Sequence, residues 1–306
     1  MLPQRCRDEA PRAASTRIRG NVKTVAILGA GDLAATLARR IAEAQLARCV
    51  VMVDADEGRA KGKALDIAQS GPVEGFDARV EATATLEAVV APDVVVIADP
   101  DDLADAVLLS TRGAERIARW LPAVGKATLL VAGPHPSPLI EAAVAKGFPR
   151  ERVLGSAPVA AASALRRRLS AELQVEPREI VVTVLGLPPG QLVVPQAAVT
   201  VAGVAVEKVS ASAFRRALAS FNGRPAGPVA LAAAALRVLR ALDGSRTTLL
   251  PVVAQLDGEY GHRRVALAVP VRIRSGRIES VVEVALDPVD RVAFDNAADR
   301  RAAGQL

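Results

Sequence analysis

The sequence predicts an α/β protein in which a doubly wound parallel sheet is followed by an α+β domain with an antiparallel meander. Val- and Leu-rich runs such as residues 94–97 and 129–131 are typical of strands that are buried on both faces of a parallel sheet. Near the end of the chain, an Asp-Gly at 257–258 and a Ser-Gly at 275–276 separate longer strand patterns, as tight hairpin turns do. Aromatic residues make up only 2% of the chain, so the core must be aliphatic.

The first half of the chain alternates strands with helices. A hydrophobic strand over residues 23–29 ends in glycine, and an Ala/Leu-rich helical pattern follows from Asp32 to about Ala47. This alternation predicts a Rossmann-type domain over residues 22–155. The other elements expected here are a strand at 49–53, a helix at 58–69, strands near 78–82 and 93–97, a helix at about 104–120 and a strand at 127–132.

The second half, residues 156–306, changes character and predicts an α+β domain of the catalytic type. Residues 1–21 contain arginines, acids and prolines but no apolar run, which indicates a disordered tail rather than a secretory signal. The elements expected in the second half are a helix at 159–173, a strand at 180–185, a hairpin-like region at 192–206, helices near 211–220 and 229–242, strands at 249–256, 263–273 and 277–286, and a closing helix over 287–303.

Composition argues against several functional classes. The formal net charge of +6 suggests a nucleic-acid-binding protein, but the basic residues are scattered and lack interleaved aromatics, so this is the weakest hypothesis. Cys6 and Cys49 stand in unrelated contexts, which predicts neither a disulfide framework nor a metal site, and Cys49 is expected to be an inert, buried small hydrophobe. No apolar run reaches the length of a membrane span, and we expect a cytoplasmic protein.

The sharpest local motif is the GAGDLA stretch at residues 29–34, placed between a strand and a helix. Its first glycine permits a tight turn, its second lets the backbone approach a pyrophosphate, and its alanine allows close packing of helix on strand. Asp54 ends the next strand, where a carboxylate holds ribose hydroxyls and disfavours a 2′-phosphate, so NAD is predicted rather than NADP. The alternative is an ordinary strand–turn–helix with an exposed acid. The candidate cofactor-binding residues are Gly29, Gly31, Asp32, Leu33, Ala34 and Asp54.

Longer segments extend this motif into a family resemblance. Residues 23–38 (KTVAILGAGDLAATLA), 50–80, 148–157, 173–186 and 256–286 resemble, in this order, the lactate-dehydrogenase-like malate dehydrogenases of the malate/lactate dehydrogenase family. The resemblance covers nearly all of residues 23–300. It implies an NAD-dependent oxidoreductase in which the helix carrying residues 63–68 packs against a second subunit. A homodimer or homotetramer is therefore expected, with an active dehydrogenase paralogue as the alternative partner.

The same resemblance shows that the catalytic residues of the family are replaced. Family members use a histidine as the general acid–base, an aspartate to orient it, and arginines to hold substrate carboxylates. The histidine belongs in a G-G-H-G-D stretch, where this chain has Pro188 and Pro189. The aspartate and one arginine belong in V-L-D-x-x-R-F-R, where Ala161 and Ala164 stand, while Arg166 matches a position outside the proton-transfer pair.

Two further arginines of the family belong in a loop that here corresponds to residues 98–107. This loop is acidic, and a dicarboxylate would meet repulsion where family members provide a clamp. In family members an Ala-Gly pair lies close to the dinucleotide, and this chain has Asp99 and Pro100 in its place. This replacement argues against cofactor binding, whereas the glycine motif and Asp54 argue for it. The acids of the loop are Asp99, Asp101, Asp102 and Asp105.

Only two histidines remain to replace the missing proton carrier. His262 lies in a predicted hairpin and is interpreted as a solvated turn residue. His135 stands where the resemblance places an asparagine that contacts substrate near the nicotinamide. It is either a substitute proton carrier or ligand contact, or a turn histidine between two prolines, and the turn is the favoured interpretation.

These observations lead to one main hypothesis and one alternative. The main hypothesis is a catalytically degenerate family member, a pseudoenzyme that keeps the dinucleotide-binding fold and the dimer helix, acts as a binding or assembly partner, and does not turn over malate. The alternative is an active NAD-dependent oxidoreductase, either malate-dehydrogenase-like or acting on a different carbonyl or hydroxy substrate.

Overall fold

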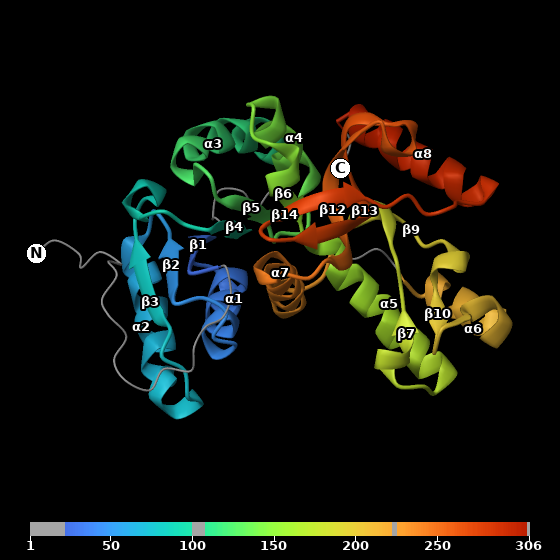
Figure 1. Cartoon of the computed structure of the whole chain (residues 1–306), viewed down its shortest axis with the longest axis horizontal. Coiled ribbons are helices and arrows are strands. Elements are labelled where there is room, and N and C mark those ends of the chain that lie inside the picture. The colour runs from blue at the N-terminus through green and yellow to red at the C-terminus, as the bar shows by residue number, and fades with distance from the viewer. Residues whose placement is uncertain (1–21, 100–107, 222–224, 305–306) are drawn as a thin grey trace, which may run out of the picture.

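The computed structural model describes residues 22–99, 108–221 and 225–304. Within them, one large mixed sheet runs through the molecule in the strand order β3-β2-β1-β4-β5-β6-β12-β13-β8-β9, and β14 pairs with β13 (Figure 1). The strands from β3 to β6 are parallel, whereas the pairings from β12 onward are antiparallel. The predicted fold class, a doubly wound parallel sheet followed by an antiparallel meander, is confirmed.

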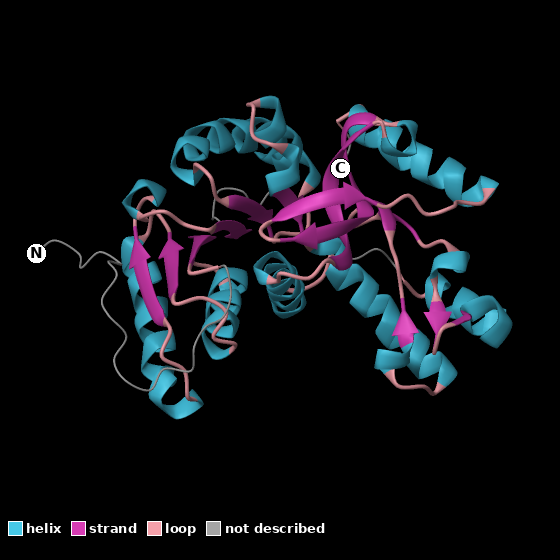
Figure 2. Cartoon of the chain, in the orientation of Figure 1, coloured by secondary structure: helices cyan, strands magenta, loops and turns pink. Residues whose placement is uncertain are grey.

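The parallel half is built from strands that carry apolar side chains on both faces. Figure 2 shows these strands between helices. Its elements are β1 (Thr24–Gly29), α1 (Asp32–Glu43), β2 (Cys49–Val53), α2 (Glu57–Glu74), β3 (Arg79–Thr83), β4 (Val94–Asp99), α3 (Leu108–Val124), β5 (Thr128–Val131), α4 (Ser137–Ala145) and β6 (Val153–Gly155).

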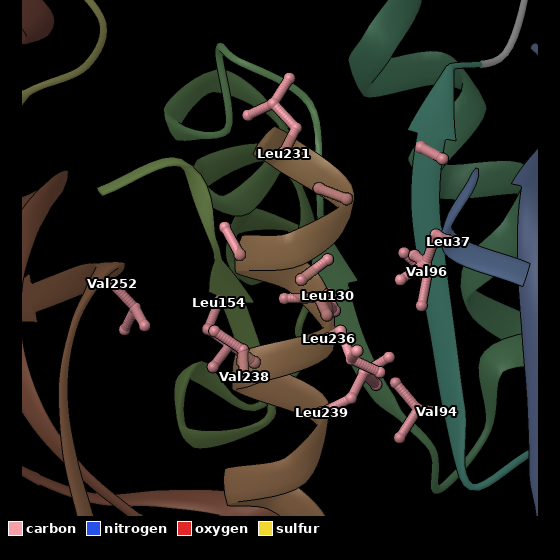
Figure 3. Close-up of a cluster of buried hydrophobic side chains, with 14 of the residues drawn as sticks. Leu37, Val94, Val96, Leu130, Leu154, Leu231, Leu236, Val238, Leu239 and Val252 are labelled. Atoms are coloured by element: carbon pink, nitrogen blue, oxygen red, sulfur yellow. The ribbon is translucent and has the colours of Figure 1, made fainter. Parts of the chain in front are cut away.

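The two faces of this half form two separate cores. Because side chains alternate along a strand, Val94 and Val96 face one layer while Val95 and Ile97 face the other. The first layer contains α1, α2 and α7 (Pro228–Asp243), and Leu239 of α7 lies beside β4 in Figure 3. The second layer contains α3 and α4. An aliphatic core is therefore formed, as the composition predicted.

The second half adds the meander and a third hydrophobic cluster that packs α5 against α6. A small sheet with the order β11-β10-β7 lies beside this cluster. The predicted domain boundary falls at the end of β6, which pairs with strands of both halves, and the division at residues 155 and 156 stays a prediction. The elements are α5 (Ala157–Leu173), β7 (Ile180–Val181), β8 (Leu185–Leu187), β9 (Gln191–Val193), β10 (Thr200–Val201), β11 (Val204–Ala205), α6 (Val206–Ala219), β12 (Thr248–Asp257), β13 (Arg263–Arg274), β14 (Arg277–Val281) and α8 (Pro288–Ala302).

Several local expectations were wrong. The helix α4 and the strand β6 were not predicted, because α4 starts within a Pro-rich stretch and β6 is only three residues long. The strand expected at 180–185 is two short strands in different sheets, and β14 ends at Val281 rather than at residue 286. Cys49 is buried, as predicted, but it is disulfide-bonded rather than a free thiol, and its partner lies outside the described residues.

Two features predicted to be absent concern metals and membranes. Within residues 22–99, 108–221 and 225–304, no group of three or more His, Cys, Asp or Glu side chains is arranged to hold a metal ion. The helices of the same ranges include none that combines the length and apolarity needed to cross a bilayer. The predicted tail over residues 1–21 lies outside the described part of the chain.

Candidate functional site

The turn between β1 and α1 has the geometry that its glycine motif predicts. Gly29 ends β1 with φ = 112°, a conformation that residues with a side chain rarely adopt. Gly31 is the N-cap of α1 and has an extended backbone (φ −75°), which any residue can adopt. The lack of a side chain at Gly31 therefore matters for the approach of a ligand to the backbone, not for the backbone conformation. Ala34 is fully buried in the core, at the start of the helix that packs on the sheet. The amino-terminal end of α1 thus lies at the carboxyl edge of the sheet, where anions bind.

The two middle residues of the motif differ in exposure. Leu33 is buried, and its side chain belongs to the core. Asp32 has 87% of its side chain exposed, and the Nζ atom of Lys63 on α2 lies 3.6 Å from its Oδ1. The assignment of Asp32 and Leu33 to a cofactor stays a prediction.

Asp54 follows β2 and is nearly buried, at 8% exposure. Arg59 Nη2 donates to its Oδ1 and Oδ2 at 3.1 and 3.0 Å, and the backbone N–H of Asp56 donates to Oδ1 at 2.9 Å. An ionised carboxylate accepts about four hydrogen bonds. The carboxylate is therefore held in one orientation and retains acceptor capacity for a ligand hydroxyl.

A cavity of about 510 Å³ opens between Gly29 and Asp54. The ends of β1, β2 and β3 form one side of this cavity, and Arg116, Arg119 and Trp120 of α3 form the other. Arg116 lies 5.8 Å from the centre of the Trp120 ring. The volume of this cavity is typical of small-molecule sites. The cavity lies outside the carboxyl ends of parallel strands, where open α/β sheets bind ligands.

The acidic loop predicted to oppose substrate and cofactor falls largely outside the described residues. The backbone of Asp99 ends β4 and pairs with Gly29 of β1. The side chain of Asp99 and the residues Asp101, Asp102 and Asp105 are not described, so the predicted repulsion stays a prediction.

A second, smaller cavity of about 190 Å³ brings together the three other segments singled out from the sequence. Ala161 and Ala164 of α5, Pro188 and Pro189 after β8, and Pro134 after β5 all line it. These positions from distant parts of the sequence therefore lie around one cavity. The described residues that line the cavity are all Pro, Ala, Leu or Phe, so they provide neither a titratable group nor a cation.

His135 lies next to this cavity in sequence, but it is not among the described residues that line it. Its Nδ1 is buried without a hydrogen-bond partner in the described structure. Burial lowers the pKa of His135 below its ordinary value, so the imidazole is neutral near pH 7.

His262 is not the solvated turn residue that the sequence predicted. Its side chain is 20% exposed, and its Nε2 lies 2.7 Å from Asp295 Oδ1 on α8. Burial raises the pKa of Asp295, but hydrogen bonds from His262 and Arg291 outweigh it and leave this pKa below its usual range. The contacts among His262, Asp295 and Arg291 connect α8 to the turn between β12 and β13. None of these three residues lines either cavity. No local sequence pattern could have predicted the contact between His262 and Asp295, because the two residues are 33 positions apart.

A broad groove runs between α5, α7 and β12. Its floor is apolar, and its described lining includes Arg167 and Arg237. On α2, Leu65 is 58% exposed and Val73 is 88% exposed.

Comparisons with known proteins agree on one family. Residues 23–100 match the sequence family described as lactate/malate dehydrogenase, NAD binding domain. A malate dehydrogenase of Chloroherpeton thalassium is 31% identical over 90% of this chain and 95% of its own length. A malate dehydrogenase of Desulforudis audaxviator is 32% identical over 90% of this chain and 95% of its own length. The solved structure of malate dehydrogenase from Salinibacter ruber superposes with a TM-score of 0.83 at 28% identity, covering 92% of this chain and 95% of that one.

Proposed function

Because the chain belongs to the lactate/malate dehydrogenase family, we propose that it is an NAD-dependent oxidoreductase whose substrate is not a dicarboxylate. The observation that supports the cofactor is Asp54, a nearly buried carboxylate oriented by Arg59 beside a cavity of about 510 Å³. A carboxylate in this place accepts hydrogen bonds from both ribose hydroxyls of NAD and opposes the extra phosphate of NADP. The site therefore fits NAD.

Different residues of the site would hold different parts of this cofactor. The turn from Gly29 to Ala34, at the start of α1, would hold the pyrophosphate, and Asp54 would accept hydrogen bonds from the ribose hydroxyls. Trp120 and the arginines of α3 form the outer wall of the cavity. When bound, NAD supplies the hydride acceptor, and NADH the hydride donor, of the reaction.

The comparisons favour an active oxidoreductase over the catalytically degenerate protein. The relatives described above carry the name malate dehydrogenase and match the chain over about nine tenths of its length. The smaller cavity nevertheless argues against malate as the substrate. A buried carboxylate requires a paired cation or several donors, and the described lining offers neither.

The catalytically degenerate binding partner remains the second candidate function. One observation supports it: the described side chains around the smaller cavity include no general acid or base. A screen that follows NADH absorbance across keto acids, aldehydes and ketones separates the two candidates. Turnover of an uncharged carbonyl supports the oxidoreductase, whereas NAD binding without turnover of any of them supports the binding partner.

Replacement of His135 by Asn is expected to reduce the loss of stability in mild acid. Burial lowers the pKa of the folded-state imidazole below 6.5, so the unfolded chain binds the proton first as pH falls. The free energy of unfolding therefore falls as the pH drops from 6.5, the ordinary pKa of histidine, toward the lower pKa of His135 in the folded state. Urea midpoints of wild type and His135→Asn at about pH 7.5 and about pH 5.5 measure this. An equal acid shift in both proteins would contradict the burial of the imidazole.

We also propose that the chain forms a homodimer through α2. The exposed Leu65 and Val73 match the apolar floor of the groove between α5 and α7, and Asp66 beside Leu65 complements Arg237 in that groove. Leu65→Glu is expected to convert the dimer to monomer, measured by light scattering after gel filtration. The control is Val289→Glu, at a site on α8 that is 77% exposed against 58% for Leu65. A wild-type monomer, or a Leu65→Glu variant that keeps the wild-type mass, would contradict the proposed surface.

A further inference from the structure

We propose that the cavity of about 190 Å³ between α5, the turn after β8 and the turn after β5 binds a small, uncharged, apolar group about the size of a benzene ring. This inference rests on the proposed function, because it assigns to the substrate the chemistry of the site beside the dinucleotide half. Four separate segments of the chain line the cavity, the fourth being represented by Phe221, Pro225, Ala226 and Leu231.

The chemistry of the wall decides the charge of the occupant. Pro188 and Pro189 lack side-chain donors, and Ala161 and Ala164 present only methyl groups. Leu192 and Phe221 contribute further apolar surface. From the described lining, an anion in this cavity would gain neither a hydrogen bond nor a counter-charge for the hydration it loses, whereas an apolar group would be transferred from water at a gain.

The volume decides the size of the occupant. An apolar cavity of roughly 150 Å³ lined by aliphatic and aromatic side chains stays dry and binds benzene. The cavity here is of similar volume, about 190 Å³. A single ring or a short branched chain fits within this volume.

Two alanines account for this space. Ala161 and Ala164 lie three residues apart on α5, so they face the same side of the helix and both border the cavity. A longer side chain at either position would occupy the volume that the proposed ligand needs. Ala164 is exposed in the free chain, so a larger residue there does not disturb a packed core.

The test uses fluorobenzene as the neutral probe and benzoate as an anionic probe of the same ring size. Fluorobenzene binding, followed by broadening of its fluorine NMR signal with the full-length protein, is expected to saturate. Benzoate, followed by competition, is expected to bind at least about tenfold more weakly. Equal or tighter binding of benzoate, or no saturable binding of fluorobenzene, would overturn the proposal.

Variants locate the binding. Ala164→Leu and Ala161→Leu are each expected to weaken fluorobenzene binding by about tenfold or more, because the added side chain fills the cavity. Ala171→Leu, at an exposed site on the same helix, is the matched control and is expected to bind as wild type. Unchanged binding in a folded Ala164→Leu variant, checked by circular dichroism, would place the probe elsewhere and overturn the assignment.

NAD titration of the same samples keeps the two proposals distinguishable. Loss of NAD binding with fluorobenzene binding intact would contradict the proposed function and leave the cavity assignment standing. NAD binding with no saturable fluorobenzene binding would contradict only the cavity assignment.

Discussion

Purified protein is expected to reduce oxaloacetate about 10⁴-fold or more slowly than the Salinibacter ruber malate dehydrogenase assayed beside it. The reason is the chemistry of the smaller cavity, whose described walls offer no proton donor and no cation. Removal of a general acid–base costs about 10²–10⁴ in rate, and loss of charged hydrogen bonds to a substrate carboxylate costs about 1.5–3 kcal/mol more. The measurement is NADH consumption at saturating oxaloacetate.

A contaminating host enzyme is the main confounding source of activity in this assay. The Asp54→Asn variant, purified in parallel, provides the control, because activity that belongs to the chain must weaken when its cofactor site is damaged. Oxaloacetate reduction within about tenfold of the Salinibacter enzyme, and sensitive to Asp54→Asn, would contradict the exclusion of dicarboxylates.

The second large effect is expected at Asp54 itself. Asp54→Asn should weaken NAD binding by about 10- to 100-fold, which corresponds to the roughly 1.5–3 kcal/mol of a hydrogen bond to a charged group. The variant also removes the negative charge that Arg59 contacts beside the cavity, so it removes the repulsion of a 2′-phosphate. NADP should therefore lose less affinity than NAD. Trp120 is the only tryptophan and lines the same cavity, so its fluorescence reports both titrations.

Glu57→Gln is the matched control for this variant. Glu57 lies three residues after Asp54 and forms only an exposed i,i+4 ion pair with Lys61 among the described salt bridges, a kind of pair that contributes little. NAD affinity is expected to stay at the wild-type value. NAD binding that is unchanged in Asp54→Asn would remove the support for the proposed cofactor site.

The parallel half of the fold was predictable because its signals are local. Val94–Ile97 is apolar at every position, as a strand covered on both faces must be, and the glycine motif at 29–34 marks the turn that follows such a strand. Elements without such signals were missed. The strand β6 is too short for a periodic pattern, and the predicted strand at 180–185 belongs to two different sheets, which only pairing partners decide.

The candidate site was predictable in part for the same reason. The glycine turn, Asp54 at the end of its strand, and the replaced positions at 161, 164, 188 and 189 could all be identified from spacing and from resemblance. The environment of His262 could not, because its contact with Asp295 joins residues 33 positions apart.

The amino-acid order alone predicted the parallel sheet and the dinucleotide turn, since each depends on residues close together in the chain. The replacement of the proton carrier and of an arginine by prolines and alanines is a prediction from the family resemblance. Two features could be seen only in the folded structure. Pro134, Ala161 and Pro189 line one apolar cavity, and Arg59 donates hydrogen bonds to the carboxylate of Asp54. Cavity volume and hydrogen-bond distance arise from the packing of segments distant in sequence, and no local pattern encodes them.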